Sequence, residues 1–241
     1  DVDLIIWPET AIPMYYHQAM DILDYLSNQH AIRGIDFLTG IPVMRKEGEY
    51  FNSVISINHE EQFRFYYKRH LVPFGEYIPF QKALGSFLQF LNIPMSEFSA
   101  GSDHQANLLG AGQAIGVSIC YEDAYGELVR SSLPAARLLV NVSNDAWFGA
   151  SIAPPQHLEI ARMRALETGR YLLRATNTGI SAVIDAKGKV VAQAPQFQIY
   201  SLRAQAMPYQ GETPYVQWGN GLVVSGLVLL LLVGGVIQYR Q

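Results

Sequence analysis

A thiol, a carboxylate and an amine each lie at the end of an apolar segment of this sequence. Cys120, the only cysteine, ends one such segment, Glu9 follows a second, and Lys68 ends a third. Open α/β sheets present the side chains at their strand ends to ligands. A thiol acts as a nucleophile when another group takes its proton, and a carboxylate held near a lysine could do so. Glu9, Lys68 and Cys120 are therefore candidates for a catalytic site.

Each of these residues also has an ordinary structural interpretation. A free cysteine is most often a small buried apolar side chain. Glu9 could be a charge at the N-terminus of a helix, and Lys68 could be a solvated strand end. Glu76 lies among aromatic residues in the loop 71–80 and must be paired if it is buried there.

Histidine is the usual partner of a catalytic cysteine, but it offers no clear alternative here. Six histidines are present, none in a papain-like or caspase-like context: His17, His30, His59, His70, His104 and His157. The sequence also lacks a G-x-S-x-G nucleophile elbow, an H-E-x-x-H zinc motif, a cysteine cluster and a phosphate-binding loop. We therefore expect neither a metal nor a cofactor.

The composition of the 241 residues excludes several classes of protein. Hydrophobic residues make up 49% of the chain, which excludes a disordered protein. A formal net charge of −4 argues against a nucleic-acid partner, because a protein that neutralises phosphates should be basic. A single cysteine excludes an intrachain disulfide.

The pattern of apolar residues predicts one α/β domain over residues 1–215. Strands are expected at 4–7, 36–44, 50–58, 63–68, 113–120, 137–144, 171–185 and 190–194, and helices at 13–29, 81–91 and 154–170. Strands that alternate with helices but also form hairpins indicate a mixed rather than a purely parallel sheet. In the last helix, two arginines lie among two glutamates, which predicts paired surface charges.

The C-terminal segment, residues 216–241, has a different character. Residues 219–237 contain no charged side chain, and as a helix they would be about 28 Å long, close to the ~30 Å hydrocarbon core of a bilayer. Trp218 and Tyr239 flank this stretch as interfacial aromatic residues do. We expect a transmembrane helix, with a buried core helix as the alternative. Arg240 favours a cytoplasmic C-terminus, with the domain on the opposite side of the membrane.

Two further features indicate that this chain is part of a larger protein. It begins in an apolar segment without a methionine or a signal peptide. The C-terminal segment contains glycines at 221, 226, 234 and 235, which would let other helices pack closely against it. We therefore expect helical partners that this chain does not contain.

The sequence resembles the apolipoprotein N-acyltransferase family, bacterial inner-membrane enzymes of the nitrilase superfamily. The matching segments are WPETAIP (7–13), YYKRHLVPFGEYIPF (66–80), SICYED (118–123), NVSNDAWFG (141–149) and HLEIARMRALETGRYLLRATNTGISAVID (157–185). The resemblance implies a nitrilase-like αββα sandwich, here truncated at its N-terminus, followed by one transmembrane helix. It also implies an N-terminal membrane bundle that is not present in this chain.

The resemblance implies a covalent, ping-pong acyl transfer through a Glu-Lys-Cys triad. Cys120 would attack a phospholipid ester and become a thioester, while Glu9 would act as general base and Lys68 would stabilise the oxyanion. The acceptor would be the α-amine of the diacylglyceryl-cysteine at the N-terminus of an apolipoprotein. The reaction would take place on the periplasmic side of the bacterial inner membrane.

The same resemblance implies supporting roles for three further residues. Glu76 should orient Lys68 or support Glu9, the Tyr121 N–H should join Lys68 at the oxyanion, and Glu122 should position the site beside the cysteine. Loops at 71–80, 84–95 and 147–155 are expected to cover the site or to enter lipid, unless they simply pack against the domain.

Two other functions remain open on the sequence. A membrane-tethered amidase could use the same triad and resolve the thioester with water. A membrane-anchored module with a degenerate site could bind lipoproteins without catalysis.

Overall fold

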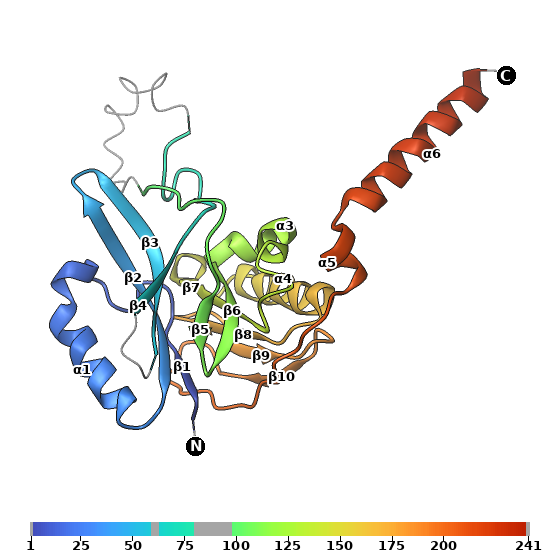
Figure 1. Ribbon diagram of the computed structural model, residues 1–241. Coiled ribbons are helices and arrows are strands. Elements are labelled where there is room, and N and C mark those ends of the chain that lie inside the picture. Colours follow the sequence, from blue (N-terminus) through green and yellow to red (C-terminus); the bar gives the residue numbers. More distant parts are fainter. Residues whose placement is uncertain (1, 59–62, 80–97, 240–241) are drawn as a thin grey trace.

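The computed structural model describes residues 2–58, 63–79 and 98–239, and these form two β-sheets with helices outside them (Figure 1). The four-stranded sheet has the order β1 (Leu4–Ile6), β2 (Asp36–Lys46), β3 (Glu49–Ile57) and β4 (Phe63–Tyr67). β1 and β2 are parallel, whereas β2, β3 and β4 form an antiparallel meander.

The six-stranded sheet is parallel at its centre and antiparallel at its edges. Its order is β10 (Val190–Gln193), β9 (Ala182–Ile184), β8 (Leu172–Thr176), β7 (Leu138–Ser143), β6 (Gln113–Ile119) and β5 (Leu108–Gly110). β6, β7 and β8 are the parallel strands. Their carboxyl ends therefore meet at one edge of the sheet, which is where this class of sheet places its ligands.

Alternation along the strands of the first sheet divides its apolar side chains between two cores. Leu38 of β2 and Val54 of β3 belong to the core between the two sheets. Their strand neighbours Phe37 and Ile55 share a second core with Leu23 of α1 (Met20–Ala31). Because successive side chains of a strand point to opposite faces, both faces of this sheet must be covered.

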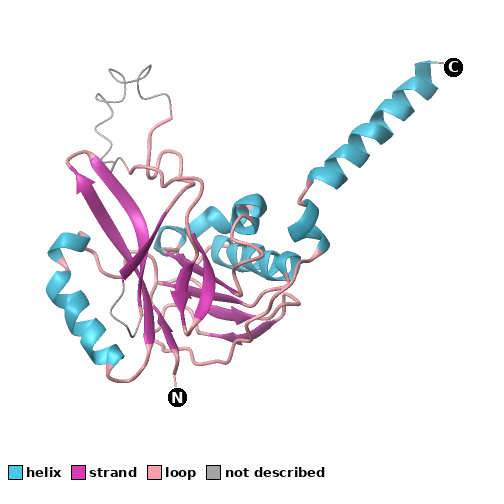
Figure 2. Cartoon of the chain, in the orientation of Figure 1, coloured by secondary structure: helices cyan, strands magenta, loops and turns pink. Residues whose placement is uncertain are grey.

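The second sheet is covered in the same way. Val140 of β7 belongs to the core between the sheets, while Leu139 shares a third core with Leu158 of α4 (Ala153–Thr168) and Val129 of α3 (Gly126–Arg130). The layers are therefore helix, sheet, sheet and helix, as Figure 2 shows. The predicted α/β sandwich of two sheets between helical layers is confirmed.

The sequence patterns predicted most elements and missed the shortest ones. β5 lies in a segment where neither a strand nor a helix was expected, and the expected strand 171–185 is divided into β8 and β9. The expected helix at 13–29 is a short 3₁₀ helix, η1 (Tyr16–Gln18), followed by α1. The expected helix at 81–91 and the loop at 84–95 lie outside the described residues.

The chain ends in α5 (Pro214–Trp218) and α6 (Gly221–Tyr239), and α6 projects away from the sandwich (Figure 1). The apolar side chains of α6 from Leu222 to Val233 are exposed. Among the residues that the structure describes, no helix combines the length and the apolar character needed to cross a membrane. The expected transmembrane helix is therefore not confirmed.

Candidate active site

Glu9 lies in the turn that follows β1, where the chain passes very close to β2. The Gly40 N–H donates to the Pro8 carbonyl oxygen over 3.1 Å, and a Cβ on Gly40 would lie 2.6 Å from the Glu9 Cα. Only glycine permits this approach. The buried Glu9 carboxylate accepts hydrogen bonds from Asn52 Nδ2 and from the Asn144 N–H, each over 2.7 Å. The backbone contact with Gly40 and the hydrogen bonds from Asn52 and Asn144 therefore fix the position and orientation of Glu9.

Lys68 follows β4 and is 1% exposed. Its Nζ lies 2.9 Å from Glu76 Oε1 and 3.6 Å from Glu9 Oε1. The other oxygen of Glu76 accepts the Val72 N–H over 2.9 Å, within the same loop. A buried ammonium is tolerated when it is paired in this way, so Lys68 is held as a cation between two carboxylates.

Cys120 is the first residue of η2 (Cys120–Ala124), the 3₁₀ turn that follows β6. Its φ of 55° is in the left-handed region, which is unusual for a residue other than glycine and is found mainly where the surrounding structure enforces it. The Asn141 side chain donates to the Cys120 carbonyl oxygen over 2.9 Å. The thiol is in hydrogen-bond contact with the Ser143 side chain and with the Tyr121 N–H.

The three residues predicted from strand ends lie together. Consecutive residues at the end of β7 connect them, because Ser143, the last residue of the strand, contacts the Cys120 thiol and the N–H of the following Asn144 donates to Glu9. The charges of both Glu9 and Lys68 also act on the thiol. Glu9, Lys68 and Cys120 therefore converge in the structure. Their catalytic roles stay predictions.

The electrostatics of the cluster favour a neutral thiol beside a base. Burial, together with the Glu9 charge, raises the pKa of Cys120 to about 12, against the opposing effects of Lys68, Ser143 and the Tyr121 N–H. Burial also raises the pKa of Glu9, against the lowering effects of Lys68 and Asn52. Burial alone would lower the pKa of Lys68, but the neighbouring carboxylates more than offset it and the pKa is raised. The resting site thus holds a thiol, an ammonium and a carboxylate with increased proton affinity.

Glu122 lies beside Cys120, is fully buried, and ties η2 to the end of β4. It accepts hydrogen bonds from the N–H groups of Arg69 (2.7 Å), His70 (3.0 Å) and Ile119 (2.8 Å). Two of these donors immediately follow Lys68 in the chain. Glu122 thereby fixes the strand end that carries Lys68 against the turn that carries Cys120.

Tyr121 is placed by two different groups. Its N–H points to the thiol, and its hydroxyl donates to the Leu71 carbonyl oxygen over 2.9 Å, in the loop that carries Glu76. Burial raises the pKa of the Tyr121 hydroxyl, which keeps it protonated as a donor at neutral pH.

Several polar residues of the site were not singled out from the sequence. Asn52 donates to both Glu9 and Glu76, over 2.7 Å and 2.9 Å, from within β3. Asn141 and Ser143 are buried in β7 among apolar residues. A polar side chain in a strand that is otherwise apolar was the available signal, because such a group must find a partner inside the protein.

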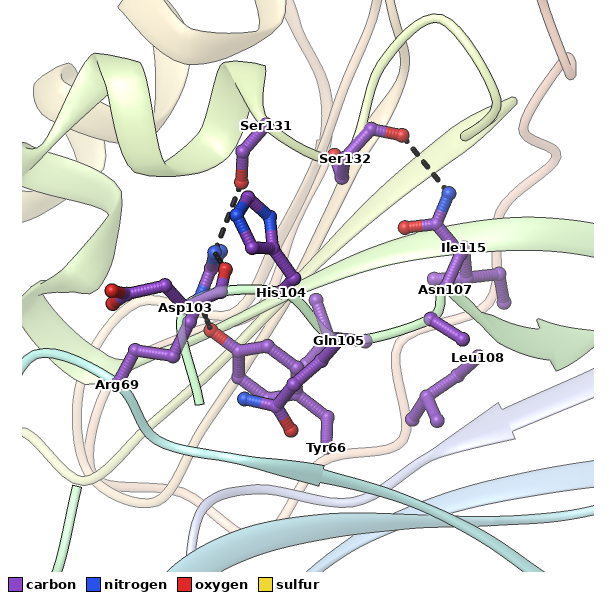
Figure 3. Close-up of a pocket in the computed structure, with 12 residues that line it drawn as sticks. Tyr66, Arg69, Asp103, His104, Gln105, Asn107, Leu108, Ile115, Ser131 and Ser132 are labelled. Carbon is purple, nitrogen blue, oxygen red and sulfur yellow. Dashed lines mark hydrogen bonds between the residues drawn. The ribbon is translucent and has the colours of Figure 1, made fainter. Parts of the chain in front are cut away.

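A pocket is present near Glu122, whose carboxylate accepts a hydrogen bond from the lining residue Tyr66 over 3.0 Å. This pocket, between β4, β5 and the end of α3, is lined by Tyr66, Arg69, His104 and Ser131, among others (Figure 3). The Arg69 guanidinium is already used within it, donating to the Asp103 carbonyl oxygen over 2.7 Å and to Ser131 Oγ over 3.0 Å. The lining does not include the thiol cluster, so this pocket is separate from the candidate active site. Within the described ranges, no group of three or more His, Cys, Asp or Glu residues is arranged to hold a metal ion.

Comparison with solved structures identifies the same fold in a carbon-nitrogen hydrolase and an amidase. A carbon-nitrogen hydrolase from Helicobacter pylori aligns with a TM-score of 0.60 at 17% identity, covering 80% of this chain and 73% of that one. An amidase from a Nesterenkonia species, solved with the acetamide moiety of fluoroacetamide on its active-site cysteine, aligns with a TM-score of 0.58 at 18% identity. It covers 80% of this chain and 73% of the amidase. At this identity the likeness concerns the fold.

Sequence comparison finds much nearer relatives. The chain is 47% identical to the apolipoprotein N-acyltransferase of Nitrosomonas europaea over 98% of its length, and 47% identical to that of Methylococcus capsulatus over 91%. It covers 48% and 44% of these two proteins, so it spans about half the length of the curated relatives that it matches. The family model for carbon-nitrogen hydrolases matches residues 1–210. The chain therefore belongs to the carbon-nitrogen hydrolase family.

Proposed function

We propose that this protein is an N-acyltransferase that moves an acyl chain from a phospholipid to the N-terminal amine of an apolipoprotein, through a thioester on Cys120. The observation that carries the proposal is the contact of Lys68 with Glu9 in the cluster that contains the only thiol of the chain. The near relatives that bear the name apolipoprotein N-acyltransferase support the same substrate class.

In the first half-reaction, Glu9 takes the proton of the Cys120 thiol as sulfur attacks the ester carbonyl carbon of the phospholipid. The raised pKa of Glu9 suits this transfer, since it narrows the gap in proton affinity between carboxylate and thiol. The oxyanion that forms is stabilised by the Lys68 ammonium and the Tyr121 N–H. The intermediate then collapses to the thioester, and the lysophospholipid leaves as an alcohol after receiving the proton from Glu9.

In the second half-reaction, the α-amine of the diacylglyceryl-cysteine attacks the thioester carbonyl. Glu9 accepts a proton from the amine, and Lys68 again stabilises the oxyanion. The amide forms as the Cys120 sulfur leaves and regains its proton from Glu9. The two substrates occupy the site in turn, so the kinetics are ping-pong.

Both substrates carry acyl chains, so the reaction requires a lipid phase beside the site. The exposed apolar side chains of α6, together with exposed Trp147 and Ile152 in the segment after β7, support contact of the protein with a membrane. We place the domain on the periplasmic side of the bacterial inner membrane, with α6 packed against further membrane helices. The support for this orientation is the basic residue Arg240 at the far end of the apolar stretch.

Mass spectrometry of the protein after incubation with a phospholipid of defined acyl chain tests the proposal. The peptide that contains Cys120 should gain the mass of one acyl group, and a diacylated lipopeptide added next should remove that group and become triacylated. Cys120→Ser should acquire no thioester. Discharge to water alone would identify a hydrolase such as an amidase instead, and the absence of any acylation in the wild-type protein would favour a non-catalytic binding module.

A further inference from the structure

The carbonyl group of Cys120 is held by two side chains from the helix-covered side of the six-stranded sheet. Asn141 Nδ2 of β7 lies 2.9 Å from the Cys120 oxygen, and His157 Nε2 of α4 lies 3.3 Å from it. Both are buried. The backbone of Cys120 also lies in the left-handed region, so two donors act on a peptide group that needs support from its surroundings.

The ring of His157 is held in place by a buried charge cluster, made up of Asp123, Asp145, His157 and Arg174. Nδ1 lies 3.1 Å from Asp145 Oδ1, and Nε2 lies 3.0 Å from Asp123 Oδ1. Arg174 connects the two carboxylates, over 3.3 Å to Asp123 and 3.0 Å to Asp145. The two negative carboxylates are balanced by the positive guanidinium and, when His157 is protonated, by its positive imidazolium.

The acceptors around His157 determine its protonation state. Both ring nitrogens face oxygen atoms of carboxylates or of the Cys120 carbonyl group, which can only accept hydrogen bonds. Each nitrogen must therefore carry a proton. In agreement, hydrogen bonds to Asp123 and Asp145 overcome the effect of burial and raise the pKa of His157 to about 9. His157 thus directs a charged N–H at the backbone of the nucleophile.

The orientation of Asn141 is determined by the same cluster. Arg174 donates to Asn141 Oδ1, so the amide nitrogen must face the other way, toward the Cys120 carbonyl oxygen and Ser118 Oγ at 3.0 Å. A rotated amide would place two donors against each other. Ser143 adds a third connection, since its hydroxyl donates to Asp145 over 2.7 Å and contacts the Cys120 thiol.

We infer that Asn141 and His157 are positioning residues for the nucleophile, holding the Cys120 carbonyl so that the thiol and the Tyr121 N–H face Glu9 and Lys68. The buried charge cluster is the frame that orients both of them. This inference rests on the proposed function only in that it takes Cys120 as the nucleophile. A rotation of the Cys120 peptide group would misdirect the sulfur and the neighbouring N–H together.

The rate at which iodoacetamide labels Cys120 in the folded full chain tests the inference directly. Asn141→Asp keeps an acceptor for Arg174 but removes the donor to the Cys120 carbonyl, and His157→Leu removes the second donor. We expect both variants to label about tenfold to a hundredfold more slowly than the wild type, because small displacements of a reacting group have effects of that size. His157→Gln, which can keep one N–H, should recover part of the rate. In urea all variants should label equally.

Glu159→Gln is the matched control, because Glu159 lies on the same helix and its carboxylate pairs with Arg162 at the surface. It should label at the wild-type rate. If His157→Leu does not fold, Ser118→Ala provides a milder test. It removes one partner of Asn141 without touching the buried charge cluster, and we expect a fall of about twofold to threefold.

Folded variants that label and acylate at the wild-type rate, or that label faster, would overturn the inference. A merely structural role would lower thermal stability and open the site, which speeds labelling instead of slowing it. The outcome is also separable from that of the proposed function. If the wild type forms no acyl-Cys120 but the order of labelling rates holds, the acyltransferase proposal fails while the positioning role stands.

Discussion

Glu9 is the residue on which both proposed proton transfers depend. Glu9→Gln keeps the shape of the side chain and an acceptor for Asn52 but cannot take a proton. We expect the rate of Cys120 acylation to fall by about 10²–10⁴-fold. In the wild type the base must be deprotonated, and burial raises its pKa, so the rate should decline on acidification at a pH above the ordinary value of 4.5.

A single-turnover acylation assay across pH measures both effects. Glu9→Asp is a suitable control, because it retains a carboxylate at a changed distance and should lie between the wild type and Glu9→Gln. A Glu9→Gln protein with an unchanged rate and pH profile would mean that another group removes the thiol proton.

Lys68 combines a proposed catalytic role with a structural one. Lys68→Met removes an oxyanion partner and leaves the carboxylates of Glu9 and Glu76 buried together without a cation. We expect the acylation rate to fall by about 10²–10³-fold and the free energy of unfolding to fall by about 3–5 kcal/mol, the usual effect of removing one partner of a buried ion pair. Urea titration and single-turnover kinetics on the same samples report the two effects separately.

Lys68→Arg separates charge from geometry at this position. It keeps the positive charge, so most of the stability should return, but a planar guanidinium cannot occupy the position of the ammonium and the rate should stay low. Recovery of the full rate by arginine would contradict the assignment of Lys68 Nζ to the oxyanion.

His157 makes the stability of the protein depend on pH near neutrality. Its pKa is raised to about 9 in the folded state from an ordinary value of 6.5. Its contribution, on the order of 3 kcal/mol, is therefore complete below pH 6.5 and is lost as pH rises toward 9. We expect the free energy of unfolding, measured by urea titration, to decrease over this interval in the wild type. The decrease should be absent in His157→Gln and unchanged in Glu159→Gln.

At the scale of the elements, the junction of β1 and β2 determines where Glu9 lies. Gly40→Ala would put a methyl group 2.6 Å from both the Glu9 Cα and the Pro8 carbonyl oxygen, which are backbone atoms that cannot move aside cheaply. We expect a loss of stability of about 1–3 kcal/mol, as for overpacking elsewhere, and a fall in the acylation rate. The control is Gly226→Ala in α6, where a Cβ meets no atom within 4 Å. Thermal unfolding of both variants measures the difference, and a fully stable, fully active Gly40→Ala protein would contradict this packing argument.

The elements that the sequence predicted best are those with long regular patterns. Apolar segments indicated β2, β3, β6 and β7, and the charges predicted to pair in α4 do pair. Arg162 and Glu159 lie at the surface as expected, whereas Arg164 and Glu167 are partly buried. β5 has three residues and is too short for any pattern to register.

The residues of the candidate site also differ in how well the sequence predicted them. Glu9, Lys68 and Cys120 could be proposed because each ends or follows an apolar segment and lies in a motif of the family that the sequence resembles. Asn52 and Asn141 lie inside strands, and their contacts with Glu9, Glu76 and Cys120 depend on which segments the fold places beside those strands. His157 contacts Asp123 of η2 and Asp145, which follows β7. Contacts between residues so far apart in the chain leave no local signal in the sequence.

At the scale of the whole molecule, α6 is joined to the sandwich close to the nucleophile. The Asn220 N–H donates to Glu127 Oε1 over 3.0 Å, and Arg130 donates to the Val216 carbonyl oxygen over 3.1 Å. Glu127 and Arg130 belong to α3, which begins two residues after the turn that carries Cys120. These contacts precede α6, whose own apolar side chains are exposed.

A chain that ends at Asn220 should therefore keep a folded sandwich and a reactive thiol but lose its attachment to lipid. We expect its thermal unfolding and its iodoacetamide labelling to match those of the full chain, because the contacts of Asn220 and Val216 remain. Binding to phospholipid vesicles, measured by flotation, should fall sharply as exposed apolar surface is removed. Acylation from vesicles should fall with it, whereas acylation from phospholipid dispersed in detergent should persist. Equal flotation of the two chains would mean that other exposed residues, such as Trp147, hold the protein at the membrane. The contacts of Val216 and Asn220 with α3 would then stabilise the fold without any role in bringing lipid to Cys120.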